Sequence, residues 1–145
     1  MTTWLLLVYK VPNEPSARRV YVWRKLKKLA AILVQDSVWV LPANPKTREK
    51  LQWLAAEIKE MEGGEASLWE AQQVFTGQDS DLIAQFNGQV DKLYQTILDE
   101  LKQEDADLSA ASKQYQQVKL QDYFDSELGE TVREMLLDSR RENDL

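Results

Sequence analysis

The chain has 145 residues, 43% of them hydrophobic, and a net charge of −6, which suits one folded domain with a core of useful volume. It contains no cysteine and no histidine, which excludes disulfides and thiolate metal sites and removes the commonest general base and metal ligand. No apolar run approaches the roughly 20 residues of a membrane helix, and the N-terminal TWLLLVY lacks the basic lead of a signal peptide, so neither is predicted.

Positive charge is concentrated in the first part of the chain. Residues 1–60 carry 11 basic and 5 acidic residues, and residues 61–145 carry 7 and 19, so the two parts have net charges of +6 and −12. This division indicates either an internal electrostatic match or two faces with different partners. Two ordinary solvated faces would give the same pattern.

The chain begins with a strand pattern followed by a helix pattern. Residues 3–11 are nearly all apolar, which is typical of a covered strand. Pro15 suits the first turn of a helix over residues 16–30, with Asn13 or Glu14 near its cap. The residues that share the apolar face of this helix, and that we expect to be buried, are Val22, Trp23, Leu26, Leu29 and Ala30.

The next apolar stretch, residues 31–41, has strand character but is interrupted by Gln35-Asp36-Ser37. It forms either a tight hairpin or one long kinked strand, and two strand segments are the favoured interpretation. A helix then begins at Asn44-Pro45, with asparagine as cap and proline in the first turn, and ends at Gly63-Gly64. Residues 65–74 alternate in polarity and predict a further strand.

The remainder of the chain is predicted to be helical. Residues 78–103 form a long amphipathic helix, and residues 105–124 form a second one after a short acidic break. Their apolar stripes must bury against the sheet, against each other or against a second copy of the chain. A last helix begins at Asp125 or Ser126, and the final RRENDL is expected to fray.

These elements predict an α+β fold. Residues 1–76 form a ferredoxin-like βαββαβ unit, whose antiparallel sheet carries both helices on one face. Residues 77–145 form a long helical hairpin and a short C-terminal helix, packed on that unit to give one structural domain overall.

Several long runs resemble the ChrB family of chromate resistance proteins, in their N-terminal half. The likeness begins with WLLLVYKVPNEPSARRVYVWRKLKKLAA and VQDSVWVLP, continues through REKLQWLAAEI and GGEASLWEA, and reaches YQTILDEL and KLQDYF in the helical part. The resemblance implies a regulator of a chromate-efflux operon that binds promoter DNA and responds to chromate. Full-length members carry a further C-terminal domain with the anion-sensing residues, so this chain is expected to be a fragment or a short stand-alone homologue. Chromate is therefore expected as a ligand only if a further sensor domain is present.

A looser similarity joins the first part to the middle domain of PaaX-type repressors and to small ferredoxin-like CRISPR adaptation proteins. The shared features are a strand, an Arg-rich helix and a Gln-x-Ser-Val-aromatic segment, here Gln35 to Trp39. In the CRISPR proteins a metal-binding aspartate follows a tyrosine at the end of the first strand, whereas Lys10 follows Tyr9 in this chain. The similarity thus implies the fold and the way in which two subunits form a dimer. The lysine in place of the metal-binding aspartate argues against nuclease activity.

The basic face of the helix over residues 16–30 is the candidate DNA contact. Lysine and arginine neutralise phosphates, arginine also reads guanine edges, and tyrosine stacks or donates a hydrogen bond. The start of the next helix adds charge where its dipole attracts phosphate. The candidate residues are Arg18, Tyr21, Arg24, Lys25, Lys27, Lys28, Lys46 and Arg48. A basic helix face is also commonly just solvated, and the acidity of the whole chain argues against strong non-specific binding.

Other chemistry has weaker support. An oxyanion needs converging cations, which Lys10, Arg18 and Arg19 could supply at one end of the sheet. The acidic clusters of the second part lack a metal-binding spacing and are interpreted as solvated helix surface. The sequence shows no nucleophile–base pair and no phosphate-binding glycine loop, so no enzyme activity, metal or cofactor is predicted.

The sequence therefore predicts a cytoplasmic, non-enzymatic regulatory module that binds promoter DNA. It is expected to form a homodimer through a sheet edge or the helical hairpin. The alternative is a dimerisation or sensor-coupling domain without direct DNA contact, and a degenerate metal-dependent nuclease-like protein is the third hypothesis.

Overall fold

The computed structural model describes residues 1–75 and 77–143, which form two compact units, Met1–Asp79 and Ser80–Leu145. Within those described ranges, no helix has both the length and the apolar character needed to cross a bilayer.

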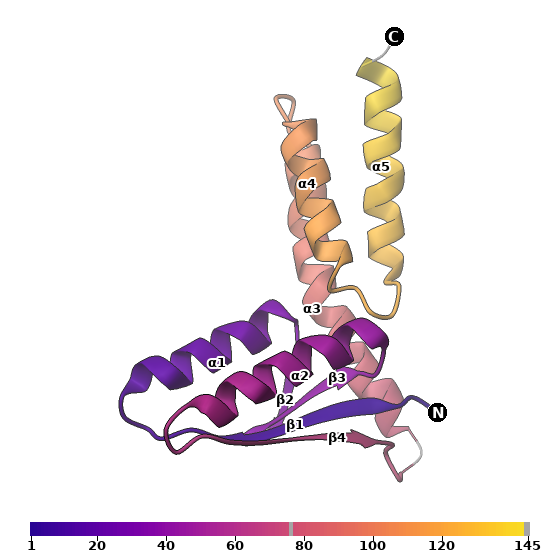
Figure 1. Cartoon of the computed structure of the whole chain (residues 1–145). Coiled ribbons are helices and arrows are strands. Elements are labelled where there is room, and N and C mark those ends of the chain that lie inside the picture. The colour runs from indigo at the N-terminus through magenta and orange to yellow at the C-terminus, as the bar shows by residue number, and fades with distance from the viewer. Residues whose placement is uncertain (76, 144–145) are drawn as a thin grey trace. The chain divides into compact units, whose positions relative to one another are not determined.

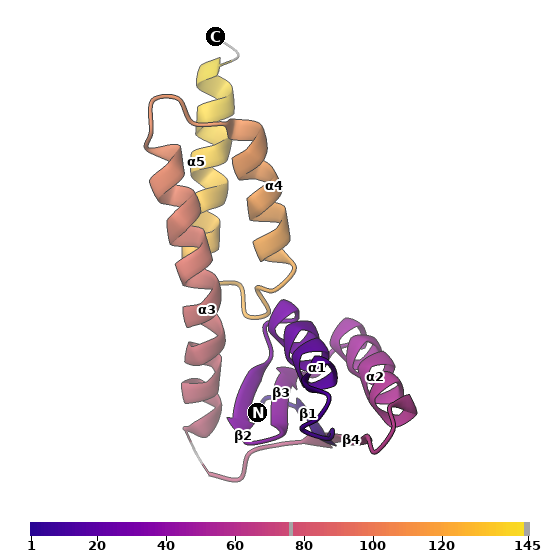
Figure 2. The same cartoon turned by 90° about the vertical axis from the view of Figure 1, so that its left-hand side faces the viewer.

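The first unit has the predicted ferredoxin-like order of elements, which confirms the α+β fold. Its four strands form one antiparallel sheet in the order β2-β3-β1-β4. The two helices α1 and α2 cover the same face of that sheet (Figure 1, Figure 2). The elements are β1 (Trp4–Lys10), α1 (Ser16–Lys28), β2 (Ile32–Gln35), β3 (Val38–Pro42), α2 (Pro45–Glu60) and β4 (Glu65–Ala71).

The segment between α1 and α2 is a hairpin, one of the two arrangements that its sequence allows. Asp36 makes the turn with a φ of 33°, and a bulge lies between Leu33 and Gln35. Before the hairpin, α1 ends two residues earlier than predicted. The reason is that Ala30 adopts a φ of 60°, in the left-handed region, after Leu29 has capped the helix.

The start of α2 follows the predicted signal, whereas the helix ends at Glu60, before the predicted Gly63-Gly64. Asn44 accepts a hydrogen bond from the backbone N–H of Thr47 at 2.8 Å, and the Thr47 hydroxyl accepts one from the backbone of Asn44 at 3.1 Å. This reciprocal capping box satisfies donors that the first turn of a helix leaves unpaired. After α2, Gly63 has a φ of 74°, and a Cβ on Gly64 would lie 2.0 Å from the carbonyl oxygen of Ile58. Only glycine fits at that second position.

The core of the first unit lies between the sheet and the two helices. The side chains that fill it are Leu5 and Leu7 of β1, Leu41 of β3, Val22 and Leu26 of α1, and Leu51, Leu54 and Ile58 of α2. The predicted burial of Trp23 is wrong, because 51% of this residue is exposed. The buried face of α1 centres on Val22 and Leu26, so Trp23 falls at its margin, where the Lys27 Nζ lies 5.9 Å from the ring centroid.

The N-terminus of the unit is held by Asp79. Its carboxylate accepts hydrogen bonds from the indole N–H of Trp4 at 2.9 Å and from the backbone N–H of Thr2 at 3.0 Å. These donors, the indole first, lower the pKa of Asp79 below its ordinary value.

The second unit is a three-helix bundle of α3 (Gln78–Leu101), α4 (Leu108–Lys119) and α5 (Glu127–Asn143). The apolar stripes of these helices bury against one another. The core residues are Val90, Tyr94, Ile97 and Leu98 of α3, Ala111, Tyr115 and Val118 of α4, and Val132 and Leu136 of α5. The expected fraying of RRENDL is wrong for its first four residues, since α5 stays helical to Asn143, and the last two residues lie outside the described part of the chain.

Candidate nucleic-acid interface

Two hydrogen bonds join α1 to the last turn of α2 and to the residues just after it, and they show how the two helices run. The guanidinium of Arg18 donates to the carbonyl oxygen of Glu62 at 2.6 Å, and the hydroxyl of Tyr21 donates to the carboxylate of Glu57. Residues at the start of α1 thus meet residues at the end of α2, so the helices are antiparallel. It follows that the end of α1 lies beside the beginning of α2.

Helical spacing places cations from both helices on this shared side. On α1, Lys25 and Lys28 follow Tyr21 at intervals of four and three residues, so the three share a face. On α2, the same intervals counted back from Glu57 reach Trp53, Lys50 and Lys46. We call the result the helix-layer surface and define it by Tyr21, Arg24, Lys25, Lys28, Lys46, Lys50 and Trp53, all of them exposed.

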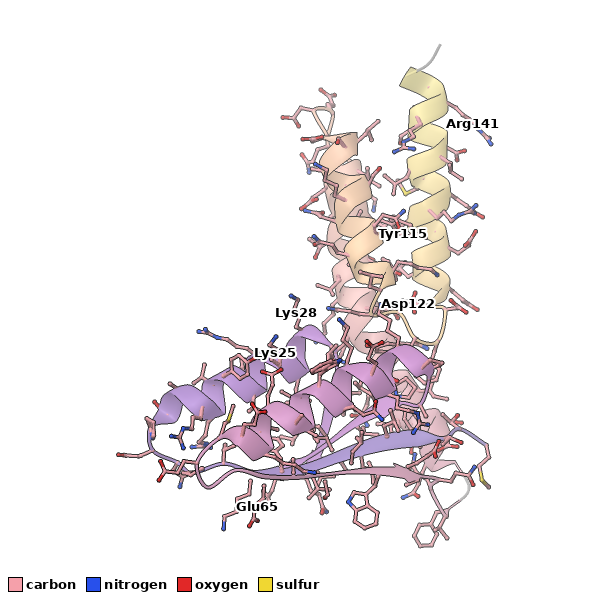
Figure 3. All side chains as sticks on the ribbon, in the orientation of Figure 1. Lys25, Lys28, Glu65, Tyr115, Asp122 and Arg141 are labelled. Carbon is pink, nitrogen blue, oxygen red and sulfur yellow. The ribbon has the colours of Figure 1, made fainter. Side chains whose placement is uncertain are left out.

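The helix-layer surface combines positive charge with aromatic rings. Figure 3 shows Lys25 and Lys28 projecting from α1 on the side away from the sheet. The Lys25 Nζ lies 5.5 Å from the centroid of the Tyr21 ring, a cation–π distance. The hydrogen bond to Glu57 raises the pKa of Tyr21 above its ordinary value, which keeps the hydroxyl protonated. On the neighbouring faces of the two helices, the five cations are accompanied by the carboxylates of Glu49, Glu57 and Glu60.

Trp53 is the aromatic residue of this surface that the sequence interpretation did not single out. It is 66% exposed, the highest value among the five tryptophans. The signal was present in the sequence, because Trp53 falls outside the apolar stripe of Leu51, Leu54 and Ile58. A large aromatic side chain on the solvent face of a helix has no core to fill.

Three of the predicted DNA-contacting residues are not part of the helix-layer surface, one because it is already engaged and two because they lie on other faces. Arg18 shares the face of Tyr21 and Lys25, but it is half-buried and its guanidinium is engaged by the carbonyl of Glu62. Lys27 lies on another face of α1, beside Trp23. Arg48 projects from the other side of α2, where it makes a 2.8 Å ion pair with Glu70 of β4. The structure therefore brings together Tyr21, Arg24, Lys25, Lys28 and Lys46 of the predicted set.

Each of the three residues predicted for an anion site lies beside a different residue of the first unit. Lys10 is exposed and lies opposite Glu65 across the pair of strands β1 and β4. Arg19 is exposed in the first turn of α1, next to Arg18.

Across residues 1–75 and 77–143, no group of three or more acidic side chains is placed to hold a metal ion.

Comparison with known proteins gives one family and one curated relative. A family model described as "Protein ChrB, N-terminal" matches residues 19–121. Protein ChrB of Cupriavidus metallidurans is 39% identical over 62 residues, which are 43% of this chain and 19% of that protein. The match thus spans about one fifth of the relative's length. No solved structure matches the chain.

Proposed function

The chain belongs to the family of ChrB N-terminal domains, and from this premise we propose that it is a DNA-associated regulatory module whose helix-layer surface contacts DNA. The observation that carries the proposal is the meeting of cations from α1 and α2 around two exposed aromatic rings.

Each part of the helix-layer surface has a role in this proposal. The lysines neutralise phosphates, which supplies sequence-independent affinity. Lys46 lies in the first turn of α2, where the helix dipole also favours a phosphate. Arg24 is the residue of the surface suited to guanine edges, since its guanidinium donates two parallel hydrogen bonds. Tyr21 and Trp53 offer faces that pack on sugar or on unstacked bases.

The rest of the proposal follows from the family. We propose promoter DNA as the partner, a cytoplasmic setting and no catalytic role. A response to chromate is proposed for a regulator that has a further sensor domain, and no residue of this chain is assigned to it.

Charge reversal at Lys25 and Lys28 tests the proposal. The variant K25E/K28E should keep its circular dichroism spectrum, because both side chains are exposed. It should lose at least tenfold in affinity for duplex DNA from its own upstream region, and the slope of log affinity against log salt should fall by about 2. Fluorescence anisotropy at low and moderate salt measures both quantities.

The matched control is K102E/K113E, which makes the same change of charge at two exposed residues of the second unit. It should bind DNA as the unchanged chain does. Equal losses in both variants would mean that only total charge matters, and undiminished binding by K25E/K28E would show that the helix-layer surface is not the DNA contact.

A second candidate function is a coupling domain that binds another protein. The exposed rings of Trp23 and Trp53 favour it, because tryptophan is enriched at protein interfaces and these two account for much of the exposed aromatic surface of α1 and α2. Absence of DNA binding by the unchanged chain even at low salt would support this function over the first.

A further inference from the structure

The two edges of the sheet differ in their readiness to accept another strand. At one edge, β2 has four residues and carries a bulge, a feature that blunts an edge against pairing. At the other edge, β4 has seven residues, and each of them pairs with β1 in unbroken register. Among the described residues β1 is the only pairing partner of β4, so its outer side presents a regular row of backbone donors and acceptors.

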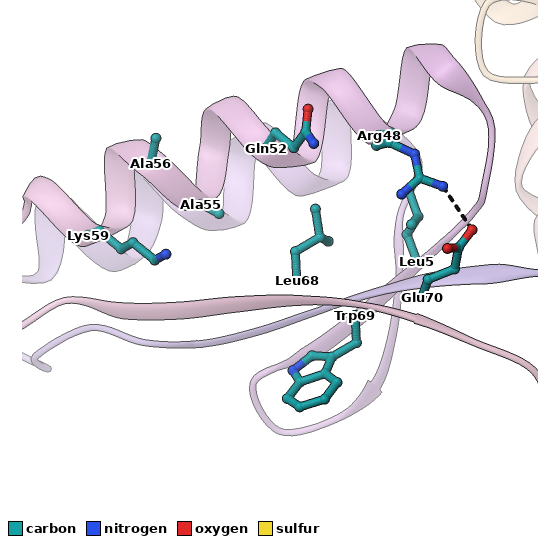
Figure 4. A pocket seen from close by; sticks show the side chains of 9 residues that line it. All are labelled: Leu5, Arg48, Gln52, Ala55, Ala56, Lys59, Leu68, Trp69 and Glu70. Carbon is teal, nitrogen blue, oxygen red and sulfur yellow. Dashed lines mark hydrogen bonds and ion pairs between the residues drawn. The ribbon is translucent and has the colours of Figure 1, made fainter.

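A groove of about 470 Å³ runs along β4 under α2 (Figure 4). Leu5, Ala55 and Leu68 give it an apolar floor. The Arg48–Glu70 ion pair lies at one end, and Lys59 lies at the other. On the opposite face of the same strand, Trp69 points away from the helices and is 60% exposed.

We propose that a second copy of this chain pairs with β4, strand against identical strand, antiparallel and centred on Leu68. The two copies of Leu68 then lie opposite each other, so the apolar floors of the two grooves adjoin. Trp69 lies opposite Ser67 of the second copy on the other face, and Glu65 lies opposite Ala71. In this register no two like charges face each other.

Opposite charges on β4 and α2 favour the same register. Antiparallel pairing about Leu68 places Glu70 of the second copy opposite Ala66. Ala66 and Lys59 lie at the same end of the groove, because α2 and β4 run in opposite directions past each other, from the Arg48–Glu70 pair onward. Glu70 of each copy therefore approaches Lys59 of the other. This inference does not depend on whether the chain binds DNA.

A single introduced cysteine tests the register, since the chain has none of its own. Opposed residues of an antiparallel pair have Cα atoms about 4.5–5.5 Å apart, within the range that a disulfide spans. The variant L68C should therefore form a covalent dimer under mild oxidation in a glutathione buffer. The control E65C places its two thiols six residues apart along the paired strands, about 20 Å, and should stay monomeric on a non-reducing gel.

Sedimentation equilibrium of the unchanged chain completes the test. A dimer in solution together with cross-linking of L68C alone supports the proposal. A monomer at every concentration, or equal cross-linking of L68C and E65C, overturns it.

A pair of charge variants tests the predicted contact between Lys59 and Glu70. K59E should weaken the dimer on the order of tenfold, because two carboxylates then meet at each end of the new interface. K50E makes the same change on the other side of α2, in the helix-layer surface, and should leave the dimer intact. Equal dimer constants for K59E and the unchanged chain would contradict the proposed arrangement.

Discussion

At the scale of single residues, the second unit depends on one buried polar cluster. The hydroxyl of Tyr94, which is fully buried, donates to the carboxylate of Asp122 at 2.8 Å. The same carboxylate accepts the backbone N–H of Ser126 at 3.0 Å, and the Ser126 hydroxyl donates to Asp91. Gly129 packs so closely that a Cβ there would lie 2.8 Å from the Tyr94 ring. The cluster thus joins α3 to the start of α5.

Replacing Tyr94 by phenylalanine tests how much this cluster contributes to the free energy of unfolding. Y94F keeps the ring and removes the donor to Asp122, which should lower the free energy of unfolding by about 1.5–3 kcal/mol, the range for a hydrogen bond to a charged group. Urea denaturation measures the change.

The control for this change is Y115F. The Tyr115 ring lies 6.1 Å from the Tyr94 ring, and no hydrogen bond of its hydroxyl is found among the described residues. Y115F should change the stability by less than Y94F does, and the opposite order would show that the Tyr94 hydroxyl does not stabilise the bundle.

At the scale of elements, the two helices of the first unit begin differently. α2 has the full capping box of Asn44 and Thr47. α1 begins after Pro15, which is its N-cap rather than part of the first turn and has no side chain to accept a backbone hydrogen bond. Asn13 and Glu14 lie just before this cap, and no side chain makes a capping hydrogen bond there. Proline fixes the backbone at this point but does not replace a capping oxygen.

This difference predicts unequal effects of two identical substitutions. N44A should lower the free energy of unfolding by about 1 kcal/mol, the usual effect of removing a capping side chain. N13A, at an exposed residue before α1, should have little effect. Thermal unfolding followed by circular dichroism compares them. A similar melting temperature for N44A and the unchanged chain would contradict the stabilising role of the capping box.

Local signals were readable from the sequence, and long-range pairings were not. Asn44-Pro45 marked the start of α2 because capping depends on a few neighbouring residues, and Gly63 marked the left-handed turn that follows the helix. The ion pair of Arg48 with Glu70 depends on which strand lies under α2, which no local pattern contains. Trp23 was predicted to be buried for a related reason. The periodicity of a helix shows which residues form its apolar arc, but not how much of that arc the sheet covers.

At the scale of the whole molecule, charge and ionisable groups are divided between the two units. The first carries 11 basic and 9 acidic residues, and the second carries 7 and 15, giving net charges of +2 and −8. The second unit also holds the tyrosines with the most altered ionisation. Burial, followed by Asp122, raises the pKa of Tyr94 far above its ordinary value, and burial raises the pKa of Tyr123 to about 12.

These shifts predict that the second unit loses stability in alkali. In the folded state both phenols stay neutral, whereas in the unfolded chain they ionise near pH 10. Their contribution to stability is therefore complete below pH 10 and falls as the pH rises from about 10 to about 12. Tyrosinate absorbance recorded together with helical circular dichroism should show late ionisation that coincides with unfolding. Ionisation of every tyrosine near pH 10 with the helices intact would contradict the prediction.

The distribution of aromatic residues makes the two units separable by spectroscopy. All five tryptophans lie in the first unit, at Trp4, Trp23, Trp39, Trp53 and Trp69, and the second unit has three tyrosines instead. Indole emission therefore reports on the sheet and its two helices alone. Iodide should quench the emission of the three exposed indoles, among them Trp53 on the helix-layer surface and Trp69 on β4. The emission of the buried Trp4 and Trp39 should not be quenched. A ligand on either surface thus protects a different indole, and single-tryptophan variants distinguish the two events without any added label.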